Sequence, residues 1–168
     1  MNYNTKHIVL ITVFYLLQII WFNHILLFGK YMPVVFLLPV LWLPLEKNEV
    51  TNLLLAFIYG ISIDLVSNTG GVFAATSVTI VYLRKIYFFM VKNPMQDIEK
   101  FQINKIGFVQ RAPYYLTFIF LGQIFVFLFE SFHFPLVWHK LPYILVNTLI
   151  TFIFFTLIDL LFLSTDKQ

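Results

Sequence analysis

Uncharged apolar stretches long enough to cross a lipid bilayer dominate this sequence. The longest begins at Ile8 and ends at Gly29, and its 22 residues include no Asp, Glu, Lys or Arg. A transmembrane helix needs about 20 mostly apolar residues to cross the ~30 Å hydrocarbon core. Only 11% of the residues are charged and 60% are hydrophobic, whereas soluble domains average about 25% charged residues. The sequence therefore predicts an all-α integral membrane protein.

The apolar stretches predict six transmembrane helices in a single membrane domain, residues 1–168. The stretch 31–45 is short and contains three prolines, so we expect a short, kinked span there, with a re-entrant hairpin as the alternative. Pro113 and Pro142 each suit the first turn of a helix. The expected spans are residues 8–29, 31–45, 50–66, 71–91, 113–134 and 142–163, and residues 92–112 form a cytoplasmic loop that is either amphipathic on the membrane surface or a solvated connector.

The distribution of Lys and Arg predicts the orientation of these spans. With the N-terminus inside, the inner segments hold nine of these residues, and the outer segments hold only Lys30 and Lys140. Positive residues favour the cytoplasmic side, so both termini are expected in the cytoplasm. The first span has no small-residue cleavage site after it and is expected to be retained as a signal anchor.

A stripe of small and polar residues marks one face of the third expected span. Asn52, Ala56, Gly60 and Asp64 follow one another at intervals of four residues, and residues at that spacing share a helix face. The Ala56 and Gly60 pair fits the small-residue pattern that lets two membrane helices approach closely. We expect this face either to pack on the next span within the chain or to bind a partner protein.

Asp64 and the turn after it form the most distinctive polar site in the sequence. The turn, residues 67–71, contains Gly70 and Gly71, which tolerate positive φ. Asn68 or Thr69 could cap the following helix. Asp64 itself has three interpretations: a carboxylate that caps the turn, a pairing point for a partner helix, or a group for proton or substrate coupling.

Motifs for other kinds of chemistry are missing from the sequence. There is no cysteine, and no nucleotide loop, metalloprotease motif or nucleophile elbow occurs, so no enzymatic activity and no cofactor are expected. Glu130, His133 and His139 lie near the outer membrane surface, but their spacing matches no compact zinc motif and an interfacial location explains them better. The basic loop is explained by topology, so nucleic-acid binding is not expected.

The third span and the turn that follows it resemble the MreD family of rod shape-determining membrane proteins. In that family a Gly, three apolar residues and an Asp precede a short Gly-containing turn and an apolar helix. Gly60, Asp64 and Gly70 or Gly71 would occupy these positions here, in the run from Leu54 to Ser67 and the turn beyond it. The chain length and span number also fit. The three prolines of 31–45 depart from the family pattern.

The resemblance implies a non-enzymatic scaffold of the bacterial elongasome, located in the plasma (inner) membrane and required for rod cell shape and lateral-wall peptidoglycan synthesis. The implied partners are MreC and also MreB, the elongation transpeptidase and the SEDS glycosyltransferase. The implied fold is similar to the substrate-capture subunits of energy-coupling-factor transporters. The alternative function is such a subunit for a small vitamin-type molecule, with an outer cavity lined by Asp64, Asn23, His24 and Gln123.

Overall fold

The computed structural model describes residues 15, 16, 18, 31, 33–43, 49–91, 108–131 and 134–163. These residues are mostly helical. Within the described ranges, three helices are long and apolar enough to cross a membrane. They are Val50–Ser67, Arg111–Ser131 and Val137–Asp159. The expected span 8–29 and residues 92–107 of the expected loop lie outside the described residues, apart from positions 15, 16 and 18.

Two of the expected spans coincide with observed helices almost residue for residue. Helix α3 covers Glu49–Ser67 and helix α4 covers Val72–Val91, where the sequence predicted 50–66 and 71–91. The polar turn between them ends the first helix because Asn68, Gly70 and Gly71 all have positive φ, which a helix interior does not accommodate.

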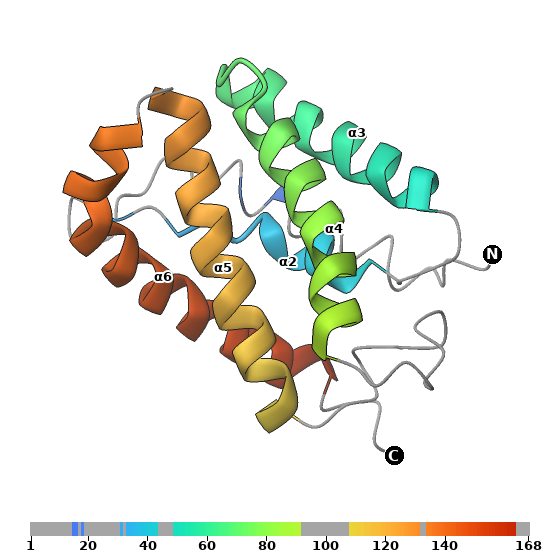
Figure 1. The fold of residues 1–168 in the computed structure, drawn as a ribbon. Helices are drawn as coiled ribbons and strands as arrows, with labels where there is room; N and C mark the ends of the chain where they lie inside the picture. The colour runs from blue at the N-terminus through green and yellow to red at the C-terminus, as the bar shows by residue number, and fades with distance from the viewer. Residues whose placement is uncertain are drawn as a thin grey trace.

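The last two helices begin earlier than the sequence predicted. Helix α5 covers Phe108–Ser131 and helix α6 covers Phe134–Leu163, so Pro113 and Pro142 lie inside helices and not at their first turns. A proline costs one ladder hydrogen bond, but in a membrane helix neighbouring groups compensate for it. Residues 108–112, expected in the loop, are therefore helical. The first turns of α6 lie at an angle to the rest of the helix (Figure 1).

The described residues of the expected short span at 31–45 contain one short helix. Helix α2 covers Leu37–Trp42 and has six residues, which is roughly 9 Å of rise. It therefore does not cross a ~30 Å hydrocarbon core as a helix. Pro39 does not kink it, because Pro39 is its third residue and the first four N–H groups of a helix have no ladder partner.

The segment from Pro33 to Leu43, which includes α2, forms the centre of the bundle. In Figure 1, α2 lies behind and between α4, α5 and α6, and α3 packs on the outer side of α4. The side chains from Val34 to Leu38 are buried. Because this segment is buried, its non-helical backbone groups need partners inside the protein. The Val34 N–H donates to Thr151 Oγ1 at 3.3 Å, and the Phe36 N–H donates to Gln18 Oε1 at 3.0 Å.

Candidate functional site

The predicted stripe on α3 faces the interior of the protein. Asn52, Ala56, Gly60 and Asp64 are all buried. The face of α3 opposite the stripe exposes large apolar residues, which are Val50, Leu54, Phe57, Ile58, Ile61 and Leu65. The four stripe residues therefore serve contacts within the chain, and they are not available on the surface for a partner.

Gly60 sets the distance between α3 and α4. A Cβ atom at this position would lie 2.5 Å from the Cα of Ala74 and 2.7 Å from the carbonyl oxygen of Phe73. Both of these atoms belong to the backbone of α4, so no side-chain rotation can make room. The pairing of α3 and α4 at this point requires glycine, as the small-residue pattern predicted.

The turn from Ser67 to Gly71 uses left-handed backbone conformations to reverse the chain. Asn68 follows the last residue of α3 with φ of 54°, and the N–H of Thr69 donates to the carbonyl of Asp64 at 3.3 Å. This is the long hydrogen bond of a Schellman motif. Gly70 and Gly71 continue the turn with φ of 66° and 99°. A Cβ on either glycine would meet no atom within 4 Å, so backbone conformation and not lack of space favours glycine there.

Asp64 caps the N-terminus of α4 from the preceding helix. Its Oδ1 accepts the N–H of Phe73 at 3.0 Å, and its Oδ2 accepts the N–H of Ala74 at 2.8 Å. The hydroxyl of Thr69 also donates to Oδ1. The residue before α4 is Gly71, which has no side-chain oxygen to satisfy these amides. The cap therefore comes from Asp64, and not from Asn68 or Thr69 as the sequence suggested, and the carboxylate also complements the positive end of the helix dipole.

A second polar cluster, which no sequence motif predicted, surrounds the last turn of α2. Arg84 of α4 is buried and donates from Nη1 to the carbonyl of Val40 and from Nη2 to the carbonyl of Leu43, both at 2.6 Å. The hydroxyl of Tyr114 donates to the carbonyl of Leu41 at 3.2 Å. The last carbonyls of a helix lack ladder partners and carry partial negative charge, so a buried cation is well placed to bind them.

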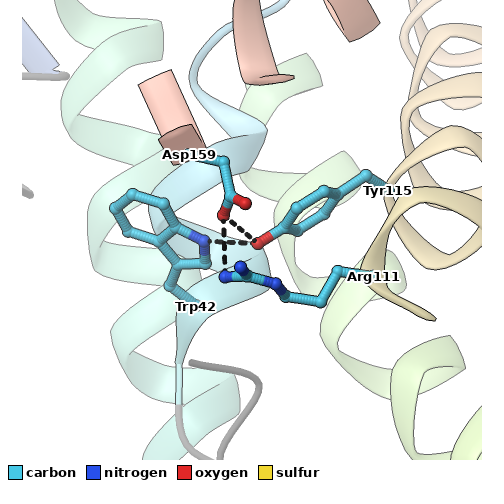
Figure 2. A network of polar contacts seen from close by, with 4 residues as sticks. All are labelled: Trp42, Arg111, Tyr115 and Asp159. Atoms are coloured by element: carbon cyan, nitrogen blue, oxygen red, sulfur yellow. Dashed lines mark hydrogen bonds and ion pairs between the residues drawn. The ribbon is translucent and has the colours of Figure 1, made fainter. Parts of the chain in front are cut away.

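On the other side of α2, four side chains from three helices form one network (Figure 2). Arg111 of α5 pairs with Asp159 of α6, with 3.1 Å between Nη1 and Oδ1. The Tyr115 hydroxyl donates to the same Oδ1 at 2.9 Å and accepts the indole N–H of Trp42 at 2.9 Å. This network connects α2, α5 and α6 with a charge pair that is almost completely shielded from solvent.

The sequence contained a weak signal for this network. Asp159 lies near the end of the expected span 142–163, and Arg111 lies just before the expected span 113–134, which places both residues at the same expected side of the membrane. Opposite charges at the same side of two consecutive spans favour an ion pair. The contribution of Trp42 and Tyr115 had no such signal, because aromatic residues are frequent throughout the chain.

The acidic and histidine residues that the sequence analysis expected near the outer surface do not form a metal site in the described part of the protein. Glu130 and His139 are both exposed, and His133 lies outside the described residues. Among the described residues, no group of three or more His, Asp or Glu side chains could hold a metal ion.

No protein-family model, curated protein or solved structure matches this chain.

Proposed function

We propose that this chain is a non-enzymatic membrane scaffold of the MreD type, which binds the transmembrane helix of an MreC-type partner in the bacterial rod complex. The observation that carries the proposal is the division of α3 into two faces. Its small and polar residues are buried, with Gly60 and Asp64 in contact with α4. Its opposite face exposes Val50, Leu54, Phe57, Ile58, Ile61 and Leu65. A rigid hairpin with an apolar outer face suits packing against another membrane helix.

The proposal includes six spans in a bacterial plasma membrane, with both termini in the cytoplasm. It also includes a fold similar to that of the substrate-capture subunits of energy-coupling-factor transporters. Its support is the three helices that are long and apolar enough to cross a membrane, and the charge asymmetry of the sequence. Helix α4, with 20 residues, is not one of these three. In this orientation the Asp64 turn faces outward, and Arg84, Arg111 and Asp159 lie toward the cytoplasm.

The contacts of Asp64 favour the scaffold over the transporter subunit. Both carboxylate oxygens are occupied by the amides of α4, so Asp64 is a structural cap and does not present itself to a solute. Gln123 is buried, and Asn23 and His24 lie outside the described residues. The MreB, transpeptidase and SEDS glycosyltransferase contacts follow from the resemblance and remain part of the proposal.

Co-purification tests the proposed partner surface. The chain is co-expressed with an MreC-type partner of full length, extracted in mild detergent and recovered by a tag. We expect the double substitution L54A and I58A on the exposed face of α3 to reduce partner recovery about tenfold, since losing roughly 1.4 kcal/mol of packing changes affinity by that factor.

The matched control is L149A with I153A, because these residues are similarly exposed on α6. Control recovery should equal that of the unsubstituted chain. Equal losses for the two double variants, or no loss for the α3 variant in a protein that remains folded, would contradict the proposed surface.

A further inference from the structure

Buried polar side chains from three helices lie around the segment from Val34 to Leu37, which leads into the first residue of α2. Contacts of this segment show which residues of α4, α5 and α6 lie beside it. Val34 bonds to Thr151 of α6, the Phe36 ring lies 4.8 Å from the Phe73 ring of α4, and the Leu37 side chain occupies the place that a Cβ on Gly122 of α5 would need.

The residues next to these contact points are polar and buried. Gln123 follows Gly122 on α5, Thr76 and Ser77 lie about one turn after Phe73 on α4, and Asn147 and Thr148 lie about one turn before Thr151 on α6. Together we call these the inner polar layer: Thr76, Ser77, Gln123, Asn147, Thr148 and Thr151.

The register of α5 against α6 independently places Gln123 in this layer. Phe127 contacts Tyr143, Tyr115 contacts Phe155, and Arg111 pairs with Asp159. The two helices are antiparallel, and equal steps along each connect these contacts. Gln123 lies four residues before Phe127 on α5, and Asn147 lies four residues after Tyr143 on α6. Gln123 is therefore opposite Asn147.

Several groups in the inner polar layer have no hydrogen-bond partner among the described residues. They include the Thr76 hydroxyl, the Ser77 hydroxyl and the Gln123 amide nitrogen Nε2. Other hydroxyls in the described helices donate to the carbonyl four residues earlier: Thr79 to Ala75, Thr148 to Ile144 and Thr156 to Phe152. Thr76 and Ser77 do not make this bond, although both have 0% exposure. A buried polar group without a partner is costly.

We propose that the inner polar layer is an internal binding site for a small neutral molecule that accepts a hydrogen bond from Gln123 and bonds to Thr76 and Ser77. The ligand is neutral because the layer contains only hydroxyl and amide side chains, and an unpaired charge in this interior would be strongly disfavoured. Bound water and a retained organic molecule share this chemistry. The inference is independent of the scaffold function, because it concerns the interior of the bundle and not its surface.

The sign of a stability change tests whether the site is occupied. In purified full-length protein, Q123M and S77A remove two of the polar groups while keeping an apolar side chain of similar or smaller size. If a ligand satisfies these groups, each variant should lower the thermal unfolding midpoint, and more so than the control T148V. Thr148 is buried in the same layer, but its hydroxyl bonds to its own helix. If the interior is dry, removing unsatisfied groups should leave the midpoint unchanged or raise it, and this result would overturn the proposal.

Native mass spectrometry distinguishes the two sources of the ligand. A bound mass on the unsubstituted protein that is absent from Q123M identifies an organic molecule. A lower midpoint in both variants, with no bound mass on the unsubstituted protein, identifies water. The organic-molecule result or the water result, together with a lower unfolding midpoint in the variants, supports the site. A bound mass that Q123M and S77A both retain fully places the molecule elsewhere and contradicts the proposal.

Discussion

Asp64 and Arg84 perform the same task at opposite kinds of helix end. Asp64 accepts amides at the N-terminus of α4, and Arg84 donates to carbonyls at the C-terminus of α2. Each charged group thus meets the end of the helix dipole that has the opposite partial charge. In both cases the capping side chain comes from a neighbouring helix. This explains how charged residues are accommodated inside a bundle whose surface is apolar.

Substitutions in the Arg111 and Asp159 pair should show strong coupling. D159A leaves the Arg111 guanidinium buried without its carboxylate, so we expect a loss of about 3–5 kcal/mol in the free energy of unfolding. The double variant R111M with D159L removes both charges and should recover most of that loss. Reversible unfolding in detergent micelles measures all the variants. Independent, additive effects of the two positions would contradict the buried pair.

At the scale of elements, the α3 and α4 hairpin was predictable because its determinants are local. The four-residue stripe of Asn52, Ala56, Gly60 and Asp64 lies within one helix, and the turn follows directly. The segment at α2 was not predictable in the same way, because its partners are distant in the sequence. Arg84 lies 44 residues from Val40, and Tyr115 lies 73 residues from Trp42.

Enlarging Gly60 should disrupt the hairpin in proportion to the added volume. G60A should cost about 1–3 kcal/mol of unfolding free energy, because overpacking forces the helix backbones apart, and G60L should cost more or prevent folding. The control is L65A on the exposed face of α3, where a change within about 0.5 kcal/mol is expected. Thermal and denaturant unfolding of the isolated protein provide the measurement. Equal stability of G60A and L65A would rule out the close approach.

At the scale of the whole molecule, the described helices form a continuous series in which α3 packs on α4, α4 on α5, and α5 on α6. The sequence predicted helical membrane segments because their composition leaves few other solutions. It misplaced the starts of α5 and α6, since a proline favours a helix start but does not require one. The central position of α2 depends on contacts with several helices, which no local pattern contains.

Cysteine labelling tests the proposed orientation, because the natural sequence contains no cysteine. H139C on α6 and M90C on α4 replace exposed residues. In intact cells a membrane-impermeant maleimide should label H139C, and M90C should be labelled only after the membrane is permeabilised. The reverse pattern would place the termini outside the cytoplasm.

The buried segment from Pro33 to Leu43 has a consequence for biosynthesis. The ribosome makes this segment before it makes the described residues of α4, α5 and α6 that form hydrogen bonds with the backbone of the segment. The Val34 amide has no acceptor until Thr151 is made. The carbonyls of Val40 and Leu43 wait for Arg84, and the carbonyl of Leu41 waits for Tyr114. Because unsatisfied amides and carbonyls are not tolerated in hydrocarbon, this early segment must reach its final place late. The packing of this segment therefore cannot be completed in the order of synthesis.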